Sequence, residues 1–366
     1  MQLPREDADF TVEWLNAAFQ EGGRAGAYQV TDVKVSPLDV PGQTAEVVKL
    51  AVTWDSAECP LPSRFVAKYT SRNQAMIESV IKVYDQYRRE TAFYQLMPEP
   101  GMAVPTCYFA RHEPETQQFA LLLNDLAPAV SPSWNATPEQ VEIAASYLPA
   151  FHAKWWMNPY LREQDWLVQY DNHDFYMAAA TAAAAAHDKI TEYFGTDAAH
   201  TQAALALWLK KIDRIAELIA NRPWTMVHAD YHPKQMFFPT AAGGEYSVID
   251  WQFCFVAQGA WDLVRIMMLG QDVESRRANQ DQILTGYLDG LARHGVKGYD
   301  RAALDEDIRL GLVVNQMIMA VALLDTDPAI IEKECAELGV DFRDVLLLRA
   351  EAGLRDWGVV ETLEKI

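Results

Sequence analysis

The sequence predicts an α+β fold with two lobes, and the order of its patterns carries this prediction. Strand and helix patterns alternate over residues 1–124, whereas helical patterns dominate residues 125–366 apart from one small strand unit at residues 226–251. Strand-rich and helix-rich parts in succession are typical of α+β proteins. We therefore expect a small β-rich N-lobe over residues 1–124 and a large helical C-lobe over residues 125–366.

The predicted N-lobe contains a few strands and two helices. Apolar residues at helical spacing predict helices at residues 10–19 and 79–96. Pro60 and Pro62 lie between two strand-like runs, at residues 47–54 and 64–69. This spacing indicates a hairpin with a longer loop. Enrichment in β-branched or apolar residues predicts strands at residues 28–35, 47–54, 64–69 and 119–123.

The predicted C-lobe is a set of helices around one hairpin. The helical patterns cover residues 138–156, 174–187, 201–221, 280–294, 304–324 and 328–338. Gly243 and Gly244 separate two apolar runs, which indicates the hairpin turn. Asp230 then lies on the loop that enters this hairpin and Asp250 ends its second strand. Such a hairpin can hold two carboxylates near one another.

Composition and charge narrow the classes of function. The 366 residues are half apolar, and the four cysteines lie far apart with no C-x-x-C pair, which fits a reducing cytosol rather than a zinc or disulfide scaffold. No run of about eighteen apolar residues and no signal-peptide pattern is present, so we expect a cytoplasmic protein without a membrane span. The net charge of −20 opposes binding to nucleic acid or anionic membranes. It suits a cationic substrate, and equally it serves solubility alone.

The segment from His228 to Asp250 is the strongest candidate for chemistry. Phosphoryl transfer requires in-line positioning, a residue that receives or orients the acceptor hydroxyl, and cations against the phosphate charge. Asp230 is suited to accept the substrate proton, and Asp250 and Gln235 offer hard oxygens for Mg²⁺. A solvated polar turn is the alternative. A zinc site at His228, Asp230 and His232 is a further alternative, but histidines four positions apart bind one metal well on a helix, which Pro233 disfavours.

A second candidate group lies in the N-lobe. Lys68 falls inside an apolar strand, where a lysine is rarely unpaired, and Glu90 falls on the following helix. A strand lysine paired with a helix glutamate directs an ammonium at nucleotide phosphates. The alternative is that Lys68 faces water on an edge strand and Glu90 is a surface charge. The loop with Gly42 and Thr44 is a weaker phosphate-covering signal, because one glycine is more often only a turn.

These elements, in this order, resemble the protein-kinase-like superfamily. The segment H-A-D-Y-H-P-K-Q at residues 228–235 resembles the H-G-D-x-H-x-x-N loop of aminoglycoside phosphotransferases and choline kinases. Residues 248–252 and 259–263 are similar to the I-D-[FW]-x … D-L-A segment, and residues 151–155 resemble the L-A-x-F-H helix end. The Asp-Trp-Gln tripeptide and the N-terminal helix resemble the ecdysteroid-kinase-like branch in particular.

The resemblance implies a role for each matching position. It implies Asp230 as catalytic base, Asp250 and Gln235 as Mg²⁺ ligands, and Lys68 on the phosphates of ATP or GTP, held by Glu90. It also implies Gly42 and Thr44 on the phosphate side, with Leu123 and Asn124 at the hinge that meets the base. Asp262 and His228 would be structural, with Asp262 bracing the catalytic loop.

Two departures from the family pattern leave a second hypothesis open. Gln235 stands where the family has Asn, and small Mg²⁺ sites demand near-ideal geometry. Ala229 replaces the usual Gly, which asks only that its φ be compatible with a Cβ. The first hypothesis is an ATP-dependent kinase that phosphorylates a hydroxyl of an unidentified small molecule. The second is a catalytically weak or inactive kinase-like protein that binds a nucleotide or small molecule; the oligomeric state is not readable.

Overall fold

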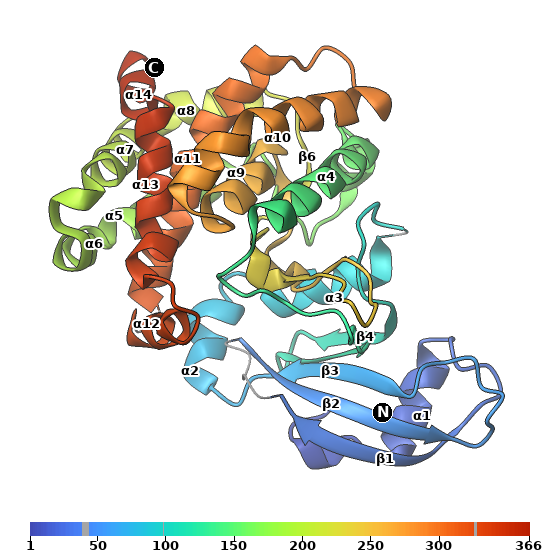
Figure 1. Ribbon diagram of the computed structural model, residues 1–366. Helices are drawn as coiled ribbons and strands as arrows, with labels where there is room; N and C mark the ends of the chain where they lie inside the picture. Colours follow the sequence, from blue (N-terminus) through green and yellow to red (C-terminus); the bar gives the residue numbers. More distant parts are fainter. Residues whose placement is uncertain (39–43, 98, 326–327) are drawn as a thin grey trace. The chain divides into compact units, whose positions relative to one another are not determined.

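The computed structural model describes residues 1–38, 44–97, 99–325 and 328–366 (Figure 1). By its internal contacts the chain forms two compact units. Unit 1 comprises Met1–Glu99, Ala103–Val130 and Pro239–Phe253, and unit 2 comprises Pro100–Met102, Ser131–Phe238 and Cys254–Ile366. This grouping differs from a single boundary after residue 124 mainly because Pro239–Phe253 joins the N-terminal strands.

Unit 1 contains a five-stranded antiparallel sheet with the strand order β1-β2-β3-β5-β4, seen in blue to teal in Figure 1. The strands are β1 (Val30–Pro37), β2 (Ala45–Trp54), β3 (Arg64–Thr70), β4 (Cys107–Glu113) and β5 (Gln118–Asn124). The four predicted strands are confirmed within a few residues. The sequence did not predict β4, because this last strand of the sheet carries Arg111, His112 and Glu113 and has no clear apolar alternation.

Side chains on the two faces of this sheet enter different cores. In β5, Ala120 and Leu122 pack in the cluster that also contains Leu15 and Phe19 of α1 (Val12–Glu21). Leu121 on the same strand packs in a second cluster with residues of the α3 side. Successive side chains of a strand point to opposite faces. Burial on both faces therefore explains why β5 reads as a continuous apolar run.

The single helix predicted over residues 79–96 is wrong. The chain forms α2 (Gln74–Met76), a π turn (Ile77–Ile81) and then α3 (Gln86–Leu96). Asp85 has a φ of 51°, in the left-handed region, which separates the two helical pieces. Ile81 is buried while Val83 is 67% exposed, so the apolar spacing did not mark one continuous buried face.

Unit 2 is mostly helical, as Figure 1 shows in green to red. Its helices are α4 (Pro138–Trp155), α5 (His173–Ala185), α6 (His187–Phe194), α7 (Ala199–Lys210), α8 (Ile212–Ala220), α9 (Ala260–Leu269), α10 (Val273–Arg293), α11 (Arg301–Asp325), α12 (Pro328–Glu337), α13 (Arg349–Asp356) and α14 (Val359–Lys365). The helix predicted over residues 201–221 is two helices that divide at Lys211, whose φ is −115°. The sequence did not predict α9, although Asp262 within it was singled out.

Short strands frame the predicted chemistry segment. In unit 2, β6 (Thr225–Val227) pairs antiparallel with β9 (Phe255–Ala257). The chain then continues through β7 (Met236–Phe237) and β8 (Ser247–Val248). Between them, Thr240 and Gly243 exchange backbone hydrogen bonds of 2.8 and 2.9 Å, which confirms the predicted turn. Gly243 and Gly244 have φ values of 107° and 94°, and such positive values favour glycine.

Helix α11 is central to unit 2 and unusually apolar. It packs against α5, α7, α9 and α13. By length and composition alone, its segment Arg301–Leu324 is able to cross a membrane, the one such helix among the described residues. However, 72% of its most apolar stretch is buried inside the protein. A helix in the core of a folded protein has the same length and composition, so this segment is only weak evidence for a membrane span.

Candidate active site

Lys68 lies in the middle of the sheet and faces α3. Its strand β3 pairs with β2 on one side and β5 on the other, so the edge-strand alternative is wrong. Ala67 and Tyr69 are buried in the α1-side core, and alternation directs Lys68 to the opposite face. There its Nζ lies 2.7 Å from Oε2 of Glu90 and 2.6 Å from Oδ1 of Asp250.

This ion triad is largely removed from solvent. The side chains of Lys68, Glu90 and Asp250 are 14%, 2% and 18% exposed. Burial opposes the charge on Lys68, but the carboxylates of Asp250 and Glu90 outweigh it and raise the pKa of Lys68 above its usual value. Burial raises the pKa of Glu90 to about 7, although the Lys68 ammonium acts in the opposite direction. The lysine therefore stays a fixed cation between two acids.

Asp250 follows β8 at a bend. Its φ is 67°, a left-handed value that Asp adopts more readily than most residues. Trp251 stacks on Phe93 of α3 with ring centroids 3.9 Å apart, which anchors the bend beside the helix that carries Glu90. Gln252 donates from Nε2 to Oδ2 of Asp250 over 3.3 Å.

Gln252 also links Thr44 to this group. The Thr44 hydroxyl donates to Oε1 of Gln252 over 3.1 Å, and the Tyr87 hydroxyl donates to the Thr44 carbonyl over 2.8 Å. Thr44 thus belongs to the same network as Asp250. Gly42, the other predicted phosphate-loop residue, lies outside the described residues. A phosphate role for either residue stays a prediction.

Leu123 and Asn124, the predicted hinge, form the end of β5. Leu123 is buried and pairs with Val66 and Cys107 across the sheet. Asn124 Oδ1 accepts the backbone N–H of Thr106 over 2.6 Å. The end of the strand is therefore fixed, whereas contact with a nucleotide base stays a prediction.

In unit 2, Asp230 is held by three side chains. Its Oδ1 accepts a short hydrogen bond from Nη2 of Arg265, which lies on α9. Its Oδ2 accepts from Nε2 of Gln235 over 3.2 Å and lies 3.3 Å from Nε2 of His232. The carboxylate is only 15% exposed. Its direction is therefore defined by the loop and by α9 together.

Electrostatics keep Asp230 ionised. Burial favours its neutral form, but His232 and Arg265 outweigh burial and hold the pKa of Asp230 well below its usual value. Burial lowers the pKa of His232, against the attraction of Asp230. A carboxylate of such low basicity orients a hydroxyl more readily than it removes the proton early in a reaction.

Asp262 braces the backbone of the same loop, as expected from the sequence. It is fully buried and accepts the backbone N–H groups of His228 and Ala229, each over 2.8 Å. Nε2 of His152 lies 3.3 Å from Oδ2 of Asp262, and Nδ1 of His152 lies 2.8 Å from the hydroxyl of Tyr287. The loop is thus tied to α4, α9 and α10 through buried polar contacts.

Ala229 carries backbone strain that the sequence interpretation did not include. Its φ is 65°, in the left-handed region, which costs a residue with a Cβ about 1–2 kcal/mol. The expectation that Ala in place of Gly requires only a φ compatible with a Cβ therefore underestimated the strain at this position. The hydrogen bond from Ala229 to Asp262 helps to hold this conformation.

Sequence reasoning missed several side chains around Asp230. Arg265 follows Asp262 by three positions, and this spacing places both on one face of a helix, a signal that was available. Trp134 stacks on His232 at 4.6 Å between ring centroids. Lys234 pairs with Glu334 of α12 over 2.8 Å. Neither of these last two contacts has a local sequence signal, because the partners lie about 100 positions apart.

The described part of the chain contains no group of side chains that by itself forms a complete metal site. No group of three or more His, Cys, Asp or Glu side chains among the described residues is arranged to hold a metal ion. The predicted Mg²⁺ ligands are Asp250 in unit 1 and Gln235 in unit 2. A carboxylate and an amide oxygen fit the chemistry of Mg²⁺, which usually keeps several waters and phosphate oxygens as its other ligands. Whether the hairpin brings Asp230 and Asp250 close together stays a prediction.

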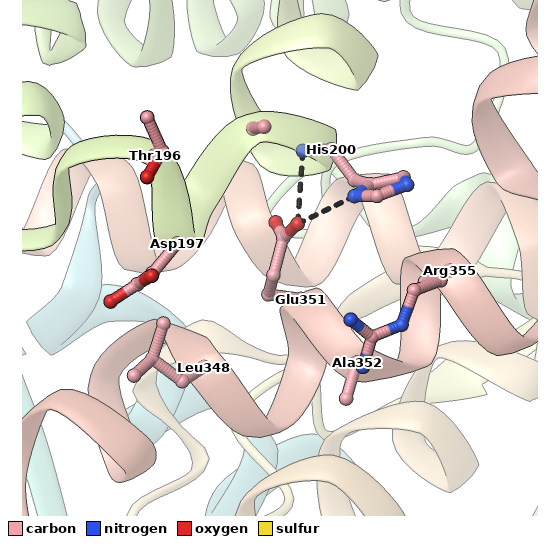
Figure 2. Close-up of a pocket in the computed structure, with 8 residues that line it drawn as sticks. Thr196, Asp197, His200, Leu348, Glu351, Ala352 and Arg355 are labelled. Atoms are coloured by element: carbon pink, nitrogen blue, oxygen red, sulfur yellow. Dashed lines mark hydrogen bonds and ion pairs between the residues drawn. The ribbon is translucent and has the colours of Figure 1, made fainter.

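A surface pocket of about 360 Å³ lies elsewhere in unit 2, between the start of α7 and α13 (Figure 2). Inside it, Oε1 of Glu351 accepts the backbone N–H of His200 over 2.9 Å and lies 2.8 Å from Nδ1 of the same residue. The carboxylate also accepts two hydrogen bonds from Thr201. Glu351 therefore caps the start of α7, and the pocket contains none of the candidate residues.

Comparisons with known proteins agree on one kinase-like group. A family model described as the ecdysteroid kinase-like family matches residues 45–297. No curated protein matches the chain. This family match spans most of the sequence and includes the candidate residues from Lys68 to Asp250.

Several solved structures of low sequence identity resemble this chain in fold. A candidate aminoglycoside phosphotransferase from Ralstonia eutropha JMP134 is 15% identical, with a TM-score of 0.53 over 96% of this chain and 98% of its own. LicA in complex with AMP is 11% identical, with a TM-score of 0.50 over 95% and 98%. Choline kinase LicA from Streptococcus pneumoniae is 13% identical, with a TM-score of 0.49 over 92% and 94%. The first two likenesses show the fold, and they confirm the predicted kinase-like α+β class.

Proposed function

Because the chain belongs to the ecdysteroid kinase-like family, we propose that it is a kinase that transfers the γ-phosphoryl group of ATP to a hydroxyl of a small molecule. The family match confirms the resemblance that the catalytic-loop motif indicated. The observation that carries the proposal is the position of the Lys68 ammonium between Glu90 and Asp250. Such a buried cation, held by two acids, is suited to bind phosphate oxygens.

Each chemical task of phosphoryl transfer has a candidate residue in this chain. Lys68 binds nucleotide phosphates, and Glu90 holds its ammonium in place. Asp250 and Gln235 would hold Mg²⁺, which neutralises charge on the phosphates when it is bound. Asp230 orients the acceptor hydroxyl. The acceptor oxygen bonds to the γ-phosphorus, the bond from the γ-phosphorus to the β–γ bridging oxygen breaks, and ADP leaves with that electron pair. The hydroxyl proton passes to Asp230 and then to solvent.

The choice of nucleotide and acceptor rests on a solved structure of similar fold and on the charge of the protein. The AMP complex of LicA supports an adenine nucleotide over GTP. The net charge of −20 favours cationic acceptors by long-range attraction, so hydroxyl compounds that bear amines come first in a screen. Four free thiols suit a cytosolic location, which we include in the proposal.

A second candidate function follows from Gln235. Its amide donates to Asp230, and its longer side chain replaces the family's Asn at a position where Mg²⁺ geometry is demanding. A kinase-like protein with these features can bind a nucleotide without transferring its phosphoryl group.

One experiment separates the two functions. The melting temperature is measured with ATP, with and without Mg²⁺, and ADP formation is measured with a panel of alcohols and amino alcohols. A kinase shows Mg²⁺-dependent stabilisation by ATP and acceptor-dependent ADP release. Asp230→Asn and Asp250→Asn abolish ADP release, whereas Asp281→Asn on the exposed surface of α10 does not. Stabilisation by ATP that is indifferent to Mg²⁺, without turnover on any acceptor, favours the binding protein.

A further inference from the structure

The carboxylate of Asp230 is held from two sides, and only one side belongs to its own loop. Gln235 and His232 on the loop contact Oδ2, at 3.2 and 3.3 Å. Arg265 on α9 donates to Oδ1 from a position that is 4% exposed. Each carboxylate oxygen offers about two lone-pair sites. The loop contacts take those of Oδ2, so one site on Oδ1, beside Arg265, is left for an acceptor hydroxyl.

Arg265 is itself fixed by α11. Its Nη1 donates to Oδ1 of Asn315 over 3.1 Å and lies 3.5 Å from Sδ of Met319. The guanidinium is planar and presents its N–H groups in a rigid fork. With Nη1 held by α11, the direction of Nη2 toward Asp230 is determined. The buried α9–α11 packing thus defines one side of the Asp230 carboxylate.

Helix α9 therefore contacts both the backbone of the catalytic loop and the side chain of Asp230. Asp262, at the start of α9, binds the backbone N–H groups of His228 and Ala229. Arg265, three positions later on the same helical face, binds the side chain of Asp230. The backbone and the carboxylate are thereby held by the same rigid element.

We propose that Arg265 is a positioning residue that fixes the Asp230 carboxylate so that its Oδ1 meets the acceptor hydroxyl. This inference rests on the proposed kinase function. Arg265 touches neither nucleotide nor acceptor in this proposal; it acts through Asp230. Misplacement of a reacting group by about 1 Å costs on the order of 10²-fold in rate. The loss of Arg265 should therefore lower kcat and leave the affinity for the nucleotide unchanged.

The test compares four variants by their kcat and KM for MgATP, with the best acceptor from the screen or, in its absence, with water. Arg265→Met should lower kcat by about 10²-fold with KM for MgATP within about twofold of wild type. Arg265→Lys keeps a cation on Oδ1 without the fork and should recover about tenfold of that loss. Asn315→Ala keeps the contact with Asp230 but removes the hydrogen bond from Nη1 to Asn315, leaving only the Met319 contact, and should give an intermediate kcat.

Arg276→Met is the matched control. Arg276 is 1% exposed, lies in unit 2, and also binds an aspartate, Asp356, which is remote from the catalytic loop in the sequence. Loss of this buried arginine should lower the melting temperature but leave kcat within about twofold of wild type. If Arg276→Met lowers kcat as much as Arg265→Met does at a similar loss of melting temperature, the fall in kcat reflects destabilisation alone and the inference is wrong.

The outcomes separate this inference from the proposed function. If wild type releases ADP and Arg265→Met keeps the wild-type kcat, Arg265 has no positioning role while the kinase function stands. If Arg265→Met raises KM for MgATP as much as it lowers kcat, the role is in binding and the inference is wrong. If wild type releases no more ADP than Asp230→Asn, the kinase function fails and the inference fails with it.

Discussion

Nζ of Lys68 lies 2.6 Å from Oδ1 of Asp250, although 182 positions separate the two residues in the sequence. The same ammonium lies 2.7 Å from Glu90, whose side chain is only 2% exposed. A buried acid in contact with one cation depends on that cation for its stability as an ion. The triad is therefore a structural element of unit 1 as well as a candidate phosphate site.

Lys68→Met should destabilise the protein and abolish its response to nucleotide. Removal of one partner of a buried ion pair leaves an uncompensated charge and costs about 3 kcal/mol. We expect this loss in the free energy of unfolding by denaturant titration, together with loss of the thermal shift with MgATP. Lys49→Met, on the exposed face of β2, is the control and should show neither effect.

Glu90→Gln in the Lys68→Met background isolates the cause. The double variant has no buried glutamate charge, so it should recover much of the lost stability while the response to MgATP stays absent. If the double variant is no more stable than Lys68→Met alone, the destabilisation does not arise from Glu90.

Asp262→Ala should be among the most destabilising substitutions in unit 2. It removes the acceptor of two buried backbone N–H groups and a contact with His152. Hydrogen bonds to a charged group contribute about 1.5–3 kcal/mol each, so we expect a loss of about 3 kcal/mol or more. Denaturant unfolding measures this loss. Asp281→Ala, at an exposed position, should change the stability by less than about 0.5 kcal/mol.

Substitutions at Ala229 should distinguish strain from packing. Ala229→Gly relieves about 1–2 kcal/mol of left-handed strain. It also removes a buried methyl group, which costs about 0.8 kcal/mol of stability. The greater conformational freedom of glycine in the unfolded chain costs about 0.4–1 kcal/mol more. The terms nearly cancel, so the free energy of unfolding should stay within about 1 kcal/mol of wild type.

Ala229→Val has no such compensation. A β-branched residue at a φ of 65° is a severe outlier. It should destabilise the protein by more than about 2 kcal/mol, and urea titration of the three proteins tests the order. Equal stability of the Val and Gly variants would contradict a left-handed Ala229.

Asp356 should make stability depend on acid pH. Hydrogen bonds from Arg277, together with Arg276 and against a smaller effect of burial, lower the pKa of Asp356 to about 2. Its unfolded pKa is about 3.9, so the ionised pair stabilises the folded state above that pH and the contribution is lost as pH falls toward 2. Partial exposure and screening limit it to about 1 kcal/mol.

Asp356→Asn measures this contribution. Wild type should exceed the variant in free energy of unfolding by a constant amount above about pH 5, and the difference should shrink below about pH 4. A difference that grows as the pH falls would show that Asp356 is not held as an anion by its two arginines.

Where the sequence predicted structure well, the signal was local. The apolar run at residues 64–69 predicted the strand that carries Lys68, and the glycine pair at 243–244 marked a turn. The predicted helix over residues 79–96 failed because apolar spacing does not report a left-handed residue such as Asp85. Likewise, β4 was missed because a strand at the end of a sheet needs no apolar alternation.

By itself, the sequence determined the α+β order of elements, the family, and the positions of Lys68, Glu90, Asp230 and Asp250 as candidate residues. These depend on periodicity and short motifs, which are properties of neighbouring residues. Only the tertiary structure decided that Lys68 bonds both Glu90 and Asp250, that Arg265 holds Asp230, and that Ala229 is left-handed. Such contacts join residues far apart in the chain, and burial and packing select them after the local elements have formed.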